Sequence, residues 1–196
     1  MIIKKLDPLE RYEIEMLNGK KVEFVITEST PEYLRFESRN CLGERVPMTE
    51  MNEWLHKQFS LLPDEIKTAI IPTERLYRDS KGEVHKETVK LFLPSAPEIF
   101  SEDECNFSAD TGLYKQLDYY KDAHNRVRAS KDGHSYAQWY WTSSRRLENS
   151  TDWCYVYYDG CAAHVDEGDT WIYATICFRI KNARWPELFN RNEVRK

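Results

Sequence analysis

The chain has 196 residues, a formal net charge of −5, and charged residues of both signs that make up 31% of its composition. This length allows one domain with a substantial core that needs no disulfide or metal for stability. No basic block is present, which argues against a nucleic-acid partner, and no apolar run approaches the roughly 20 residues of a membrane span. Residues 1–8 become charged too early for a signal peptide, so we expect synthesis in the cytoplasm.

The cysteines favour a reduced, intracellular chain. They are odd in number, widely spaced and lack a Cys-x-x-Cys pair: Cys41, Cys105, Cys154, Cys161 and Cys177. Release of the protein on a phage particle is compatible with this pattern.

The N-terminal part, residues 1–47, is predicted to form strands. Residues 13–17 and 22–26 alternate between polar and apolar types and flank Asn18-Gly19, which is the strongest short hairpin signal. A third alternating run covers residues 33–37.

Residues 48–125 are predicted to form a helical block. Thr49 is a candidate N-cap for a helix in which Met51, Trp54, Leu55 and Phe59 recur at helical spacing. A second helix should begin at residues 62–65, which combine an early proline with acidic residues, and should end before residue 72, a proline.

The second half of this block contains further predicted elements. Residues 77–87 are expected to be a polar turn or loop, and residues 89–93 a short strand. Ser95 and Glu98 have capping-box spacing and predict a helix to about residue 105, and residues 112–124 are expected to be helical as well.

The last third contains three aromatic-rich runs, at residues 139–144, 153–160 and 176–180, which we expect to be strands. The chain is thus predicted to form one domain over residues 1–186, followed by a charged tail at 187–196.

The order of these motifs is similar to that of a known domain family. The helix with Trp54, Leu55 and Phe59 is followed by Leu-Phe-Leu-Pro-Ser-Ala-Pro-Glu at 91–98, Tyr-Trp-Thr-Ser-Ser at 140–144, Val-Tyr-Tyr-Asp-Gly at 156–160 and Cys-Phe-Arg-Ile at 177–180. This order resembles a bacterial and prophage domain family of unknown function with a C-type lectin-like fold. That fold is similar to the folds of the formylglycine-generating enzymes and of the variable proteins diversified by phage retroelements. The resemblance implies an α+β fold, with a small, mixed, mostly antiparallel sheet and two or more packed helices. The family favours Trp-Trp-Leu-Arg-Ser and Val-Arg-Pro-Ala at two of these motifs, so the chain departs from the pattern there.

The aromatic run at 153–158 is the strongest candidate for a binding surface. Alternate side chains on a strand point to opposite faces, so if Cys154 and Val156 face the core, then Trp153, Tyr155 and Tyr157 face outward. Such rings provide large contact areas at low entropic cost. Six further residues are expected near them on loops: Asp152, Asp159, His164, Asp166, Trp171 and Tyr173. In the retroelement-diversified relatives, this end of the fold carries the ligand-binding residues. The alternative is that the aromatic side chains cover a helix or strand of the same chain.

No catalytic motif, metal site or cofactor site is predicted. Cys161 and His164 lie near Asp166 and Asp169, but no second pair completes a tetrahedral metal site, so we interpret them as solvated loop residues. The calcium-binding triplets of lectins with this fold do not occur in the sequence. Arg126 and Arg128 are interpreted as structural arginines, bound to carbonyls or a carboxylate.

We therefore expect a non-catalytic recognition domain that binds a protein or glycan, in a phage or prophage setting. One alternative is an oxidoreductase of the formylglycine-generating type, which would need converging cysteines. The other is a structural component of a particle or assembly, and homo-oligomer formation is left open.

Overall fold

The computed structural model describes residues 4–5, 11–129, 136–184 and 188. Its strands are β1 (Lys4–Lys5), β2 (Arg11–Glu15), β3 (Lys21–Ser29), β4 (Tyr33–Ser38), β5 (Ile70–Ile71), β6 (Thr73–Arg78), β7 (Val84–Val89), β8 (Arg128–Ala129), β9 (Ala137–Gln138), β10 (Tyr140–Arg146), β11 (Asn149–Val156), β12 (Ala162–Asp166) and β13 (Cys177–Lys181). Its α-helices are α1 (Met51–Leu61), α2 (Asp64–Ala69), α3 (Ala96–Ile99) and α4 (Asp118–Lys121), with 3-10 turns η1 (Met48–Glu50), η2 (Ala123–Arg126) and η3 (Asn182–Arg184). The α+β class is confirmed.

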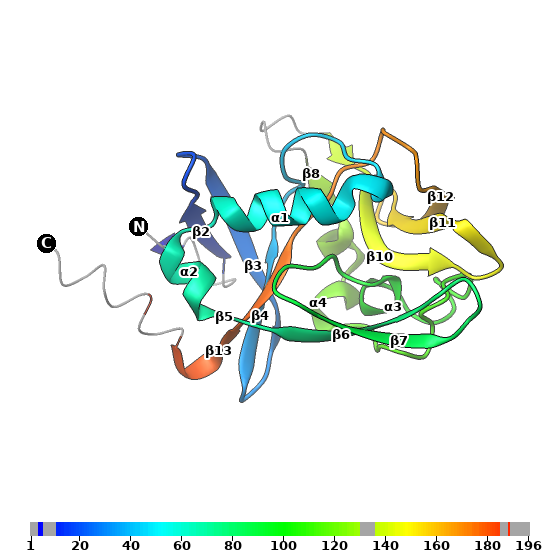
Figure 1. Ribbon diagram of the computed structural model, residues 1–196, viewed down its shortest axis with the longest axis horizontal. Helices are drawn as coiled ribbons and strands as arrows, with labels where there is room; N and C mark the ends of the chain where they lie inside the picture. The colour runs from blue at the N-terminus through cyan, green and yellow to red at the C-terminus, as the bar shows by residue number, and fades with distance from the viewer. Residues whose placement is uncertain (1–3, 6–10, 130–135, 185–187, 189–196) are drawn as a thin grey trace, which may run out of the picture.

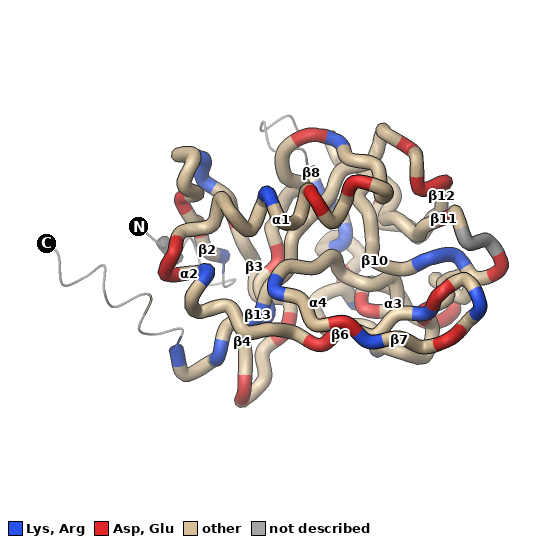
Figure 2. Tube along the Cα trace, viewed as in Figure 1, with Lys and Arg blue, Asp and Glu red and all other residues tan. Residues whose placement is uncertain are grey.

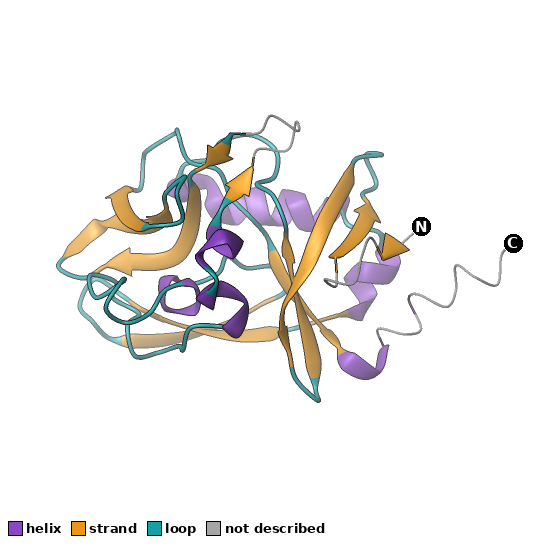
Figure 3. Ribbon diagram, turned by 180° about the vertical axis from the view of Figure 1, so that it is seen from behind, coloured by secondary structure: helices purple, strands orange, loops and turns teal. Residues whose placement is uncertain are grey.

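Two antiparallel sheets organise the chain. The larger sheet has the order β1-β2-β3-β4-β13-β5, so β13 near the end of the chain pairs with β4 near its start. The smaller sheet has the order β10-β11-β12. Figure 1 shows the two sheets at opposite ends of an elongated molecule, with α1 running alongside both. The view from behind in Figure 3 shows α3 and α4 beside the smaller sheet.

Several N-terminal predictions are confirmed. Strands β2 and β3 form the hairpin predicted at Asn18-Gly19, and Gly19 adopts the positive φ of 75° that such a turn requires. Helix α2 begins directly after Pro63, as predicted. Thr49, in contrast, lies inside η1, and α1 begins after Glu50 without a side-chain cap.

Four predictions in the middle of the chain are wrong in type or in length. Residues 77–87 belong to the β6–β7 hairpin, whose strands consist mostly of polar residues and lack the polar–apolar alternation that predicts a half-buried strand. The predicted strand at 89–93 is reduced to the end of β7 and one isolated bridge from Phe92 to Cys177. The helices predicted at 95–105 and 112–124 shrink to α3 and α4, because tertiary hydrogen bonds hold the intervening chain, such as those between the Tyr114 hydroxyl and the main chain of Leu76.

Three apolar clusters fill the interior. The first lies between the large sheet and helices α1 and α2, and it contains Phe36 stacked on Phe178 with ring centroids 5.4 Å apart. The second and third lie on opposite faces of the small sheet. Leu188 is buried in the first cluster, while the rest of the predicted tail at 187–196 lies outside the described residues.

Buried ion pairs connect the large sheet to α3 and to β6. Glu98 of α3 accepts hydrogen bonds from Arg35 of β4 at 2.6 Å and from both terminal nitrogens of Arg75 of β6 at 2.7 Å. The same carboxylate completes the predicted capping box with Ser95. Away from this buried set, Figure 2 shows acidic and basic residues interspersed along the trace in this view.

The two arginines at the end of the helical block have structural partners, as predicted. Arg126 donates to the Tyr120 carbonyl and to Glu104. Arg128 donates to the Asn125 carbonyl at 2.9 Å and to Glu37 at 3.3 Å.

Candidate functional site

Strand β11 presents different side chains to its two faces, as the alternation predicts. Cys154 and Val156 belong to a buried cluster with Tyr120 and Tyr140. Tyr155 faces the opposite way, into the cluster that contains Trp141. Each face of the small sheet therefore contributes to its own core.

The expectation that Tyr155 is exposed is wrong. Only 9% of the residue is accessible, because its ring lies 6.0 Å from the ring of Trp139 and 6.4 Å from that of Trp141, in a cluster that also contains Met51 of α1. Burial raises the pKa of Tyr155, and the nearby Tyr157 and Asp169 raise it further. For this residue the alternative holds, namely that an aromatic side chain of β11 packs under a helix of its own chain.

The rings continue outward from Tyr155 as a connected series. Trp139 stacks on Tyr157 with centroids 5.2 Å apart, and Tyr157 contacts Tyr158 at 4.3 Å. We call these four residues, Trp139, Tyr155, Tyr157 and Tyr158, the aromatic row. The row runs from the buried Tyr155 through the half-buried Trp139 and Tyr157 to Tyr158, which is 48% exposed.

A tight turn holds the outer end of this row. The main-chain nitrogen of Tyr157 donates to the Cys161 carbonyl at 2.8 Å, and that of Gly160 donates back to the Tyr157 carbonyl at 2.9 Å. Gly160 has a φ of 88°, and a Cβ at this position would lie 3.2 Å from the Ala123 carbonyl oxygen. Glycine is therefore required here, and the turn fixes the backbone that carries Tyr157 and Tyr158.

Trp153 is separated from the row and has its own partners. Its indole nitrogen donates to Glu167 at 3.2 Å, and the guanidinium of Arg145 lies 4.3 Å from the ring centroid. Trp153 therefore packs between its own charged partners, Arg145 and Glu167, and not against the aromatic row.

Trp171 and Tyr173 form a second aromatic site around Arg45. The guanidinium carbon of Arg45 lies 5.1 Å from the Trp171 ring centroid and 5.3 Å from that of Tyr173. Tyr173 packs against the cluster on the Cys154 side of the sheet, whereas Trp171 is 62% exposed. The structure thus divides the predicted aromatic surface into three places.

The predicted acidic rim already has partners within the chain. Asp152 lies on β11 rather than on a loop, 3.4 Å from Arg146 and 3.3 Å from Nδ1 of His164. Asp159 accepts from the Cys161 main-chain nitrogen and Asp166 from that of Gly168, each at 2.9 Å. These carboxylates stabilise turns and strand pairs at the small sheet.

Sequence reasoning missed Trp139 and Tyr158 as members of the site. A signal for Trp139 was present, because it lies two residues before Trp141 and should share its face. Tyr158 lies beyond the end of β11, so the alternation of side chains along the strand does not predict which way its side chain points.

The cysteines show little sign of reactivity. All five are free, and all but Cys161 are buried. Burial raises the pKa of Cys41 to about 12 and that of Cys105 to about 11. Protonated thiols are weak nucleophiles, so these side chains act as apolar core residues at neutral pH.

One group of possible metal ligands occurs among the described residues. Ligand atoms of Asp79, Glu83 and His85 lie within 4.8 Å of one another at the tip of the β6–β7 hairpin. Asp79 also accepts main-chain hydrogen bonds from Lys81 and Glu83, so the needs of the turn account for its position. Cys161 and His164 are not part of this group.

The comparisons with known proteins identify a family. Residues 47–177 match the family described as Domain of unknown function (DUF6273), which covers more than half of the chain. The chain therefore belongs to this domain family of unknown function. No curated protein and no solved structure matches the chain. None of the helices in the described part of the chain has the length and apolar character of a membrane-spanning segment.

Proposed function

We propose that this chain is a non-catalytic recognition domain that binds a protein or glycan through the outer end of its aromatic row. The observation that carries the proposal is the aromatic row, which begins at the buried Tyr155 and ends at the solvent-exposed Tyr158. Rings that are already ordered lose little conformational entropy when a partner binds, so more of the contact energy appears as affinity.

We also propose that the fold is C-type lectin-like and that the domain serves in a bacterial or prophage setting, on a phage particle or in the cytoplasm. The pairing of β4 with β13, the separate small antiparallel sheet and the packed helices α1 and α2 support this fold. The setting follows from the motif order alone.

The test is a binding screen with wild-type protein against a glycan array and a set of candidate partner proteins. Tyr158→Ala and Tyr157→Ala should each weaken binding by about thirtyfold, which corresponds to about 2 kcal/mol. Tyr77→Ala is the matched control, because Tyr77 is an exposed aromatic residue on β6. Binding that is unchanged by both row substitutions would contradict the proposal.

The same variants distinguish a structural role. If the row joined copies of this chain, wild-type protein would self-associate with rising concentration, and Tyr158→Ala would abolish that association. Sedimentation measurements on both proteins separate this outcome from recognition of a different molecule.

A further inference from the structure

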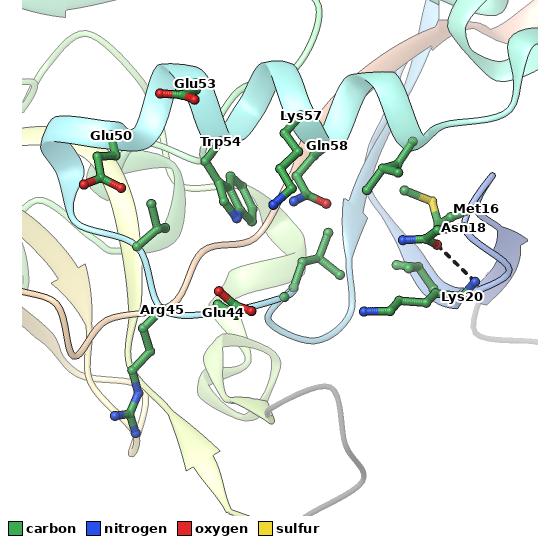
Figure 4. A pocket seen from close by; sticks show the side chains of 15 residues that line it. Met16, Asn18, Lys20, Glu44, Arg45, Glu50, Glu53, Trp54, Lys57 and Gln58 are labelled. Atoms are coloured by element: carbon green, nitrogen blue, oxygen red, sulfur yellow. Dashed lines mark hydrogen bonds between the residues drawn. The ribbon is translucent and has the colours of Figure 1, made fainter.

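A second surface feature lies away from the aromatic row. A groove of about 500 Å³ separates α1 from residues 42–46 and from the β2–β3 hairpin (Figure 4). This volume is within the range of small-ligand sites, about 300–1,000 Å³. One face of helix α1 lines the groove together with Glu50, the last residue of η1. The helix residues have the spacing expected for one face: Glu53, Trp54, Lys57, Gln58 and Leu61.

Gln58 is the most informative residue of this groove. The residue is 8% exposed, its side-chain amide pairs with no group in the described part of the chain, and the amide atoms are not among the fully buried ones. Figure 4 shows the amide directed into the groove. The amide therefore faces the groove with its donor and acceptor unpaired, and a ligand that offers both a donor and an acceptor can pair with it.

Trp54 provides a second polar contact and an apolar surface. Its ring lies on the groove wall beside Gln58, and its indole nitrogen donates no hydrogen bond within the described residues. Gly43 lies opposite, and a Cβ there would stand 3.9 Å from that nitrogen. The glycine therefore leaves the approach to the indole N–H open.

Charged residues of both signs line the groove, and Glu44, Arg45 and Glu53 are among them. Lys20 lies on the β2–β3 hairpin, Lys57 lies beside Gln58 near the middle of the groove, and Glu50 lies at the opposite end (Figure 4). Neither lysine forms an ion pair within the described residues. Seven residues separate Glu50 from Lys57, which corresponds to about 10 Å along a helix. Three residues of extended chain span about the same length.

We propose that the groove binds a short, extended peptide segment of a partner. A carboxylate of this peptide segment lies between Lys20 and Lys57, a main-chain amide of the segment pairs with Gln58, and an apolar side chain of the segment packs on Trp54. The cationic end of the segment lies near Glu50. A main-chain amide offers an adjacent donor and acceptor, which a primary amide such as Gln58 matches. The site uses a different surface from the aromatic row, so it goes beyond the function proposed above.

The carboxylate can belong to a chain terminus or to an acidic side chain, and the probes distinguish them. The three probes are acetyl-Lys-Leu-Leu with a free carboxylate, the same peptide as its C-terminal amide, and acetyl-Lys-Leu-Leu-Asp as its amide. Binding is followed by the nitrogen–proton resonance of the Trp54 indole, which is assigned from its loss in Trp54→Phe. We expect a saturable shift with at least one carboxylate peptide and about tenfold weaker binding of the uncharged-end peptide.

Two substitutions test the residues of the groove. Gln58→Ala should weaken binding by about tenfold, because it removes two hydrogen bonds. Asn52→Ala is the matched control, because Asn52 is an exposed amide residue on the same helix outside the groove. Lys57→Gln changes an exposed residue, so it provides a second test if Gln58→Ala does not fold. This variant should weaken the binding of the two carboxylate peptides but not that of the peptide with an uncharged end.

Three results would overturn the inference. The first is no saturable shift with any of the peptides at about 10 mM, the weak limit for a specific contact. The second is equal binding of the free-acid, aspartate and uncharged-end peptides. The third is a Lys57→Gln variant that binds the carboxylate peptides as the wild type does. A shift caused by a neutral oligosaccharide but by no peptide would assign the groove to a different ligand class.

Discussion

Glu98 should be the most consequential single carboxylate for the stability of this domain. It is buried between Arg35 and Arg75, and it also accepts hydrogen bonds from the main-chain nitrogen and hydroxyl of Ser95. Glu98→Gln retains the shape but leaves two buried guanidinium groups without their common counter-ion. Removing one partner from such a pair costs about 3–5 kcal/mol of unfolding free energy.

The cost should depend on pH in a defined direction. The pKa of Glu98 is held well below its usual value of 4.5, because Arg35 and Arg75 outweigh the opposing effect of burial. A carboxyl group with a lowered folded pKa contributes stability that is complete above the unfolded pKa and is lost as pH falls. Between pH 4.5 and pH 3 the loss approaches about 2 kcal/mol, at about 1.4 kcal/mol per pH unit. The gap between wild type and Glu98→Gln should therefore narrow from about 3–5 kcal/mol at pH 7 to about 1–3 kcal/mol at pH 3.

Urea unfolding followed by tryptophan fluorescence at both pH values measures this gap. Glu104→Gln is the comparison, because Glu104 also binds an arginine, Arg126, but its side chain is 44% exposed. Its loss should cost about 1 kcal/mol or less. A Glu98→Gln cost below about 1 kcal/mol at pH 7, or a gap that is constant between the two pH values, would refute the reasoning.

Three further predictions concern individual side chains. Native protein should react with a thiol reagent at Cys161 alone, as counted by mass spectrometry, and two or more fast-reacting thiols would contradict the burial of the other cysteines. Asp159→Asn should speed the labelling of Cys161 near pH 8, because the hydrogen bond to Asp159 raises the pKa of this thiol. Trp141→Phe should lower the unfolding free energy by about 1–3 kcal/mol, because the indole nitrogen donates a hydrogen bond to the Val46 carbonyl at 2.7 Å. Trp171→Phe, at an exposed position, should change the unfolding free energy by less than about 0.5 kcal/mol. Tyr155→Ala should cost about 3–5 kcal/mol of stability in the same urea assay, and a neutral result would mean that its ring is not part of the core.

The sequence predicted those parts of the fold whose signals are local. The turn at Gly19 requires a positive φ, and the capping box at Ser95 and Glu98 requires only residues of one short segment. Both appear as predicted. The lengths of the helices after Ser95 were wrong, because contacts distant in sequence determine where the chain leaves the helix, as at Tyr114 and Leu76.

The burial of apolar side chains on the predicted helix and strands illustrates the same limit. Trp141, Val156 and Phe178 are fully buried, as their positions on apolar faces indicate. Trp54 and Leu55 of α1 are only partly buried. Helical spacing gave the correct face of α1, but the presence of a groove beside that face depends on the separate segment at 42–46.

The same reasoning explains why the binding surface could be predicted only in part. Alternation along β11 correctly separated Tyr155 from Cys154, since it follows from the pleat of any strand. Exposure is a different property, because it depends on which other element covers each face. Trp141, Met51 and the rest of the third cluster cover Tyr155, while the turn at Gly160 carries Tyr158 beyond the sheet. A function that depends on exposed rings should therefore be sought at the end of the strand, where the backbone turns away from its own core.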